Sequence, residues 1–131
     1  MKRIVTGMAL LLAATGLAHA AGDPVAGKTV FVKCMICHKV GPGAMNGVGP
    51  QLNGVVGRKA GTVADYMYSD ANKNSGLTWT EDVLTKYLAG PQQVVPGTKM
   101  TFIGLTGDTG PADIANVIAY LKTFKADGSS Q

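Results

Sequence analysis

The chain has 131 residues, of which 46% are hydrophobic and 15% are charged, and its formal net charge is +4. Loss of an N-terminal segment that carries Lys2 and Arg3 lowers the charge to +2, which is too small to argue for binding to nucleic acid. The 111 residues that follow position 20 amount to one domain, without repeats, low-complexity tracts or internal linkers.

The N-terminus has the pattern of a secretory signal peptide. A positive segment, 1–3, precedes an apolar stretch, 4–17, and small residues stand at both ends of 18–20. The apolar stretch has about 14 residues and a membrane-spanning helix needs roughly 20, so a retained anchor is the less favoured alternative. We predict cleavage after Ala20, a mature domain over 21–131, no stable membrane insertion and a periplasmic location.

A first helix is predicted at the start of the mature chain. Asp23 is a suitable N-cap, and Pro24 suits the first helical position because its missing N–H would have no partner there. Apolar residues then continue toward the only two cysteines of the chain. The helix is expected to end near Cys37.

Both cysteines lie in the pentapeptide 34–38, which is the haem c attachment motif. The thiols of Cys34 and Cys37, on one helical turn, can form thioethers with the two vinyl groups of a porphyrin, and His38 then projects toward the iron. Structural zinc would need about four protein ligands, and the only other histidine is His19. A thioredoxin-like pair would follow a strand rather than a helix. One covalently bound haem c is therefore predicted, with His38 as an iron ligand.

The middle of the chain is predicted to be mostly loop. Residues 40–76 are rich in Gly, Pro, Asn and Asp, and they show neither helix nor strand periodicity. A loop of that length is unusual in a compact domain, unless it wraps around a prosthetic group. A capping box at 78–81 begins a helix that Gly90-Pro91 ends, and 91–110 is again expected to be loop.

The last predicted element is a helix that begins at Gly110-Pro111. Its apolar residues between 114 and 124 follow the i, i+3, i+4, i+7 spacing, and Lys122 and Lys125 lie near its negative end. No strand is predicted. The expected fold is all-α, with three to five helices and long loops wrapped around one haem.

The far side of the iron has either a second protein ligand or an open position. Four of the six methionines follow Ala20, and Met35 lies inside the attachment turn, from which it cannot reach across the porphyrin. Met100 ends a Pro-Gly turn at 96–100 that can present a side chain inward. On these grounds alone Met100 is either an iron ligand or a gap-filling core residue.

Several short segments stand in a characteristic order: Gly49-Pro50, 57–59, 68–74, Trp79, 87–88 and 96–100. Together they resemble class I cytochrome c of the soluble mitochondrial and alphaproteobacterial kind, over nearly the whole mature chain up to about Phe102. The resemblance implies that Met100 is the second iron ligand and that Met45 and Met67 are core or surface residues.

The resemblance also implies roles for residues around the haem. Pro50 is expected to accept a hydrogen bond from the imidazole of His38, which sets the tautomer and basicity of that ligand. The haem propionates, costly charges in a dry pocket, are expected to be neutralised or hydrogen-bonded by Arg58, Tyr68 and Trp79. Read without the family, Arg58 would be a surface cation and Trp79 a core residue. The remaining expected pocket residues are Asn72, Tyr87 and Thr98, beside the methionine, and Phe102, at the haem edge.

The function implied by the resemblance is electron transport, not enzymatic catalysis. Two protein ligands leave no open position for substrate, so the iron would exchange single electrons with redox protein partners, a donor and an acceptor complex. A haem peroxidase or a ligand-sensing haem protein, each with an open sixth position, is the alternative. The protein is expected to be a monomer.

Lysines are the expected docking residues for such partners, because opposite charges steer encounter. Two segments, 41–47 and 104–110, depart from the family pattern, so the partner-facing surface follows less closely from the resemblance than the haem pocket does. The candidate docking lysines are Lys28, Lys33, Lys39, Lys73 and Lys99.

Overall fold

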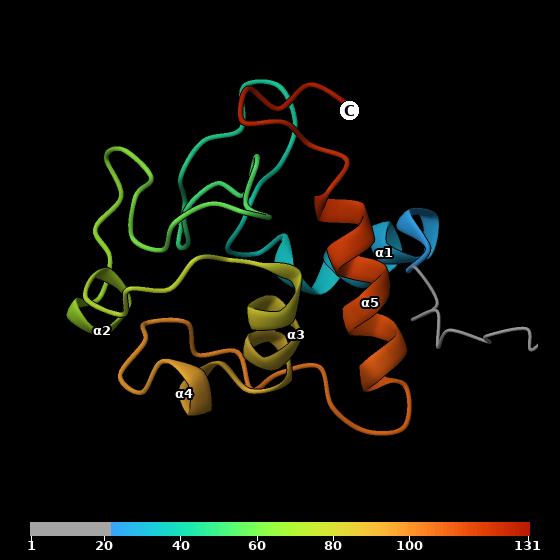
Figure 1. The fold of residues 1–131 in the computed structure, drawn as a ribbon. Coiled ribbons are helices and arrows are strands. Elements are labelled where there is room, and N and C mark those ends of the chain that lie inside the picture. The colour runs from blue at the N-terminus through green and yellow to red at the C-terminus, as the bar shows by residue number, and fades with distance from the viewer. Residues whose placement is uncertain (1–21) are drawn as a thin grey trace, which may run out of the picture.

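The structure is a computed structural model that describes residues 22–131. The predicted signal peptide and its cleavage site lie outside the described residues. Within them the chain forms five α-helices and one 3₁₀ turn, joined by long loops (Figure 1). The helices are α1 (Pro24–Phe31), α2 (Asp70–Lys73), α3 (Glu81–Ala89), α4 (Pro91–Val94) and α5 (Gly110–Leu121), and the 3₁₀ turn is η1 (Val32–Cys34).

The predicted all-α class is confirmed. Over residues 22–131 the only strand-like pairings are two isolated bridges, Lys59 with Thr78 and Phe124 with Ser130. In the same range, no helix is both long and apolar enough to cross a membrane.

Helices α1 and α5, from the two ends of the described chain, pack against each other (Figure 1). They approach so closely at Gly27 that a Cβ atom there would overlap the carbonyl of Asn116. Phe31 packs beside the ring of Tyr120, with 5.5 Å between the ring centroids. The backbone N–H of Asp23 also donates to Asn116 Oδ1 at 2.8 Å. The crossing brings the first and last helices together and so closes the fold.

The first helix begins as predicted and ends earlier. The Asp23 carboxylate accepts a hydrogen bond from the N–H of Val25 at 2.8 Å, as an N-cap does. The α-helix stops at Phe31, and the 3₁₀ turn η1 then leads into a turn over 34–37, with i→i−3 bonds from the N–H of Met35 to the carbonyl of Val32 at 3.4 Å and from the N–H of Cys37 to the carbonyl of Cys34 at 3.1 Å. This tighter winding, rather than an α-helix to Cys37, carries the pentapeptide.

Helix α3 begins two residues later than the predicted capping box. Thr80, not Thr78, is the N-cap, and its hydroxyl accepts from the N–H of Val83 at 3.2 Å. Thr78 is instead extended against Lys59 in an isolated bridge. The prediction was wrong because threonine stands at both positions, and only the pairing with a distant segment decides between them.

The two predicted loops each contain one helical turn. Helix α2 interrupts the loop over 40–76, and the hydroxyl of Ser69 caps it by accepting from the N–H of Asn72 at 3.1 Å. Helix α4 follows Gly90 with a proline at its first position. Helices of four residues have no hydrophobic periodicity to read, so the sequence pattern does not reveal them.

Candidate cofactor site

The long loops and the helices enclose a cavity of about 330 Å³. This is within the range of small-molecule and cofactor pockets. All twelve site residues named from the sequence line it: Cys34, Cys37, His38, Pro50, Arg58, Tyr68, Asn72, Trp79, Tyr87, Thr98, Met100 and Phe102. The other methionines within residues 22–131, Met35, Met45 and Met67, do not line the cavity and are exposed.

The cysteines of the pentapeptide lie at the cavity wall as half-buried free thiols. Burial raises the pKa of Cys34, so this thiol is protonated at neutral pH. The two side chains do not pair as a disulfide although only two residues separate them. Both thiols are therefore free to bond to a group in the cavity.

The imidazole of His38 is held in one tautomer. Its Nδ1 lies 2.7 Å from the carbonyl oxygen of Pro50. A carbonyl can only accept, so Nδ1 carries the proton and Nε2 keeps its lone pair for a metal. Burial lowers the pKa of His38, which favours the neutral imidazole that a metal binds. A Cβ at Gly49 would overlap the ring, so glycine is needed there.

The turn over 96–100 places Met100 against the same cavity. Thr98 is buried, and its hydroxyl accepts from the N–H of Met100 at 3.2 Å. The Tyr87 hydroxyl lies 3.3 Å from Met100 Sδ and donates to it. Burial raises the pKa of Tyr87, so its hydroxyl stays protonated and can act as this donor. One sulfur lone pair is left for another partner.

A half-buried cation stands beside the cavity. Arg58 Nη1 donates to the carbonyls of Gln51 at 3.2 Å and Asn53 at 3.1 Å. Burial lowers the pKa of Arg58, which measures the cost of removing its charge from water. Its remaining N–H groups can meet an anionic group, because guanidinium carries five donors in all.

The aromatic side chains form much of the apolar wall. Trp79 is 7% exposed and packs on Tyr87, with 4.6 Å between the ring centroids. The hydroxyl of Tyr68 accepts from the N–H of Val63 at 3.0 Å. Phe102 is partly buried against the same core. The cavity thus combines apolar walls with a few placed polar groups, as ligand pockets do.

One buried polar atom lacks a partner. The side-chain oxygen Oδ1 of Asn72 is buried, lines this cavity and accepts no hydrogen bond. Such atoms are rare in native proteins because the lost hydrogen bond costs free energy. The unpartnered Asn72 oxygen is consistent with a bound group or an ordered water in the cavity that donates a hydrogen bond to it.

Two supporting residues were missed from the sequence: Tyr66, which lines the cavity, and Asn53, which lies outside its lining and holds the adjoining loop. Tyr66 packs edge-on against Tyr68 at 4.8 Å and donates from its hydroxyl to the Val48 carbonyl at 2.7 Å. Asn53 is buried and bonds both backbone groups of Gly41. The spacing of Tyr66 and Tyr68 is a weak signal for a shared face, whereas nothing in the sequence marks Asn53 among the other turn residues.

Comparison with known proteins now adds the decisive observation: the pattern of the cytochrome c family matches residues 24–125. The chain belongs to the cytochrome c family. A cytochrome c2 from Rhodoblastus acidophilus is 62% identical over 109 residues, which cover 83% of this chain and 99% of the relative. A cytochrome c2 from Blastochloris viridis is 48% identical over the full length of both chains.

Solved structures agree with this assignment of the fold. Cytochrome c2 from Rhodospirillum centenum has a TM-score of 0.74 and 39% identity, and covers 79% of this chain and 99% of its own. Cytochrome cH from Methylobacterium extorquens has a TM-score of 0.70 and 50% identity, and the match covers 78% of this chain and 99% of that structure's chain. As a cytochrome c, this chain carries one covalently bound haem c at Cys34 and Cys37 and acts as an electron carrier.

A first prediction concerns Arg58. Arg58→Gln removes a charged donor from two carbonyls, so we expect the free energy of unfolding to fall by about 1–3 kcal/mol, as measured by denaturant titration. Arg58→Lys keeps the charge but lacks the paired guanidinium donors, so it should recover part of the lost free energy of unfolding. Lys59→Gln is the matched control at an exposed neighbour. An Arg58→Gln variant as stable as the control would show that these hydrogen bonds contribute nothing.

Proposed function

We propose that His38 and Met100 are the two axial ligands of the haem iron, and that the protein is a periplasmic one-electron carrier without an enzymatic activity of its own. The observation that carries this proposal is the shared cavity. Both cysteines, the His38 ring and the Met100 side chain line it, although Met100 is far away in the sequence. When bound, the haem supplies the Fe(III)/Fe(II) couple.

The two proposed ligands differ in chemistry. The neutral imidazole is a nitrogen donor whose basicity is raised by the hydrogen bond to Pro50. The Met100 thioether is soft and favours Fe(II) over Fe(III), as does burial of the site in an apolar pocket. We therefore expect a positive reduction potential. The Tyr87 hydroxyl draws electron density from the same sulfur and so tunes the ligand.

The remaining pocket residues are proposed to hold the periphery of the haem. Arg58, Tyr68 and Trp79 would neutralise or hydrogen-bond the propionates, which are otherwise costly in a dry site. Asn72 and Thr98 would belong with Tyr87 to a polar network beside the methionine. Phe102 would cover the haem edge.

Peroxidase and ligand-sensing functions both require an open sixth position. His38 is the only histidine of the described chain and is already committed as a ligand in this proposal. No second imidazole then remains beside the cavity to act as a general base toward peroxide. A closed, six-coordinate carrier is therefore the function that the site supports best.

Met100 can be tested directly as a ligand. Met100→Ala should open the iron to added imidazole or cyanide and lower the reduction potential, since a soft neutral ligand is lost. Met45→Ala and Met67→Ala are matched controls, because both side chains are largely exposed. Absorption spectra and potentiometry measure both effects. Ligand binding that appears only in a control variant would refute the assignment of Met100.

Export and processing belong to the same proposal. Cleavage after Ala20 would release a mature chain that begins at Ala21, and the purified protein should be a monomer. We expect an intact mass equal to residues 21–131 plus one haem, and haem that stays with the polypeptide in acid-acetone. Haem extracted into the solvent, or a mass that includes residues 1–20, would contradict this prediction.

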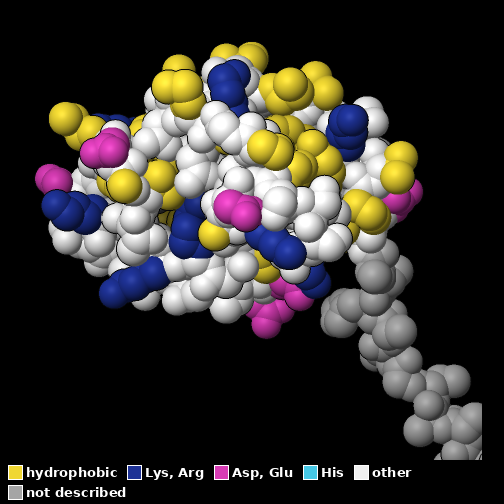
Figure 2. All heavy atoms as spheres, turned by 90° about the horizontal axis from the view of Figure 1, so that it is seen from above, with side chains coloured by type: hydrophobic (Ala, Val, Ile, Leu, Met, Phe, Trp, Pro, Cys, Tyr) yellow, Lys and Arg dark blue, Asp and Glu magenta, His cyan; other side chains and the backbone are white. Residues whose placement is uncertain are grey.

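Partner docking is proposed to use lysines at the mouth of the cavity. Of the five candidates, Lys33 and Lys99 line the cavity, whereas Lys28, Lys39 and Lys73 do not. Figure 2 shows one face on which basic side chains are spread apart, with hydrophobic side chains between them and some acidic groups nearby. A face of such mixed charge would steer an acidic redox partner only modestly, so the proposed docking relies on Lys33 and Lys99 themselves.

A charge-reversal series tests this docking surface. Lys33→Glu and Lys99→Glu should each slow association with an acidic redox partner and flatten its salt dependence, because salt screens charges over roughly 8 Å at physiological ionic strength. Lys125→Glu, away from the cavity lining, is the matched control. Stopped-flow rates over a salt series measure the effect. Rates indifferent to both reversals would indicate apolar docking instead.

A further inference from the structure

The last residues of the chain fold back on themselves after α5. In this tail (residues 124–131), the N–H of Lys125 donates to the carbonyl of Ser129 and the N–H of Gly128 to the carbonyl of Lys125, both at 2.9 Å. Phe124 and Ser130 form an isolated antiparallel bridge. The tail is therefore a small hairpin, which Figure 1 shows in red at the top of the view, beside the loop that follows η1.

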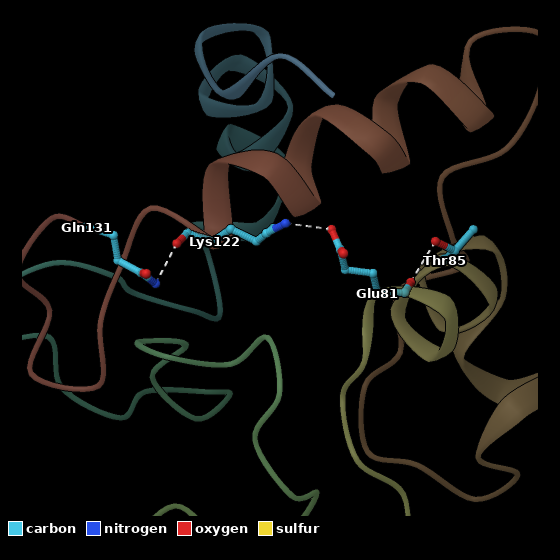
Figure 3. Close-up of polar contacts among 4 residues, drawn as sticks. All are labelled: Glu81, Thr85, Lys122 and Gln131. Atoms are coloured by element: carbon cyan, nitrogen blue, oxygen red, sulfur yellow. Dashed lines mark hydrogen bonds and ion pairs between the residues drawn. The ribbon is translucent and has the colours of Figure 1, made fainter. Parts of the chain in front are cut away.

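The end of this hairpin is hydrogen-bonded to the two residues that follow α5. The backbone N–H of Gln131 donates to the carbonyl of Thr123 at 2.9 Å, and its side-chain amide donates to the carbonyl of Lys122 at 2.8 Å. The Lys122 ammonium in turn pairs with Glu81, at the start of α3, at 3.0 Å (Figure 3). The Gln131 amide thereby satisfies the carbonyl of Lys122, the C-cap of α5, which has no hydrogen-bond partner within the helix.

The body of the hairpin rests on the loop that follows the haem motif. The N–H of Gly54 donates to the carbonyl of Phe124 at 3.2 Å. Gly128 is buried, has φ +84°, and lies so close to Gly41 that a Cβ atom would overlap the Gly41 carbonyl. A Cβ at Gly54 would likewise lie 3.0 Å from Ala126. The two segments thus meet backbone to backbone.

That loop (residues 38–54) is the one that orients His38. Buried Asn53 accepts from the N–H of Gly41 at 2.8 Å and donates to its carbonyl at 2.9 Å. The N–H of Leu52 donates to the carbonyl of Lys39 at 3.0 Å. Pro50 lies in the segment that these hydrogen bonds hold, and its carbonyl accepts the hydrogen bond from His38 Nδ1. The N–H of Asn53 also donates to Gln51 Oε1 at 2.7 Å, and Gln51 directly follows Pro50 in the chain. Contacts therefore lead from Gly128 through Gly41, Asn53 and Gln51 to the residue that bears this carbonyl.

We propose that the tail is a clamp that positions the loop over 38–54, and that Gly128 is a positioning residue for the hydrogen bond from His38 to Pro50. Without the clamp, the glycine-rich loop has few buried apolar contacts of its own and opens locally more often. The inference rests on the proposed function only in taking His38 as an iron ligand, since the loop contacts do not depend on Met100.

The direct test replaces Gly128 with alanine. In haem-loaded Gly128→Ala, we expect amide hydrogen exchange over 38–54 to accelerate by about tenfold or more, with exchange over α3 little changed. The Nδ1 proton of His38, followed by NMR in the ferrous protein, should exchange faster as well. General destabilisation would instead accelerate exchange in every segment.

Gly107→Ala is the matched control. Gly107 has φ +80°, close to that of Gly128, but an added Cβ would meet no atom within 4 Å. The two variants share the backbone strain and differ in the contact with Gly41. If both variants leave the loop unchanged, or both accelerate exchange equally over the whole chain, the clamp is refuted.

A shortened chain that ends at Lys125 provides a second variant, because it removes the hairpin without inserting an atom. Loop-selective acceleration is again expected, and wild-type exchange over 38–54 would refute the clamp. If neither variant folds, the tail serves the stability of the whole domain, and the positioning role is also refuted. Failure of Met100 as a ligand leaves these exchange results unaffected, so the two proposals fail separately.

Discussion

The hydrogen bond between the His38 ring and the Pro50 carbonyl is the interaction on which the site depends. At 2.7 Å it fixes the proton on Nδ1 and leaves the Nε2 lone pair free to bind a metal, so one contact selects both tautomer and ring orientation. It requires the backbone of the following loop to return against the ring. Gly49 makes this return possible, because any larger residue would overlap the imidazole.

A second constraint is that the long loops around the cavity must find hydrogen-bond partners for their peptide groups without regular secondary structure. Loops need partners for their peptide groups, and in this protein those partners come largely from other loops and from side-chain amides. The Asn53 amide bonds the backbone of Gly41, the Arg58 guanidinium donates to two nearby carbonyls, and the Tyr66 hydroxyl donates to the carbonyl of Val48. The α1 and α5 crossing closes the core behind these loops. The shape of the pocket therefore depends on hydrogen bonds between the turns of these loops as well as on the packing of the helices.

Local signals predicted the elements that local physics decides. Asp23 with Pro24, and the apolar spacing along α5, specify helices because capping and one-sided burial act over a few residues. The start of α3 and the end of α1 were misplaced by the same kind of reasoning. At the start of α3 a longer-range contact, the bridge of Thr78 with Lys59, overrides the local pattern. At the end of α1 the difference is itself local, because the chain continues in i→i−3 turns through the cysteine motif, and the hydrophobic spacing does not distinguish these from an α-helix. The short helices α2 and α4 carry too few residues to show a period.

By itself the sequence predicted the covalent cofactor: two cysteines and one histidine stand in the spacing of the haem c attachment motif, and the family resemblance implied Met100 and its neighbours. These features are readable because covalent attachment needs adjacent residues. The tertiary structure decided which other groups support them, namely the two hydrogen bonds between Asn53 and Gly41 and the hairpin over 124–131. Neither has a sequence signature, since both join backbone or common side chains that only folding brings within hydrogen-bond distance.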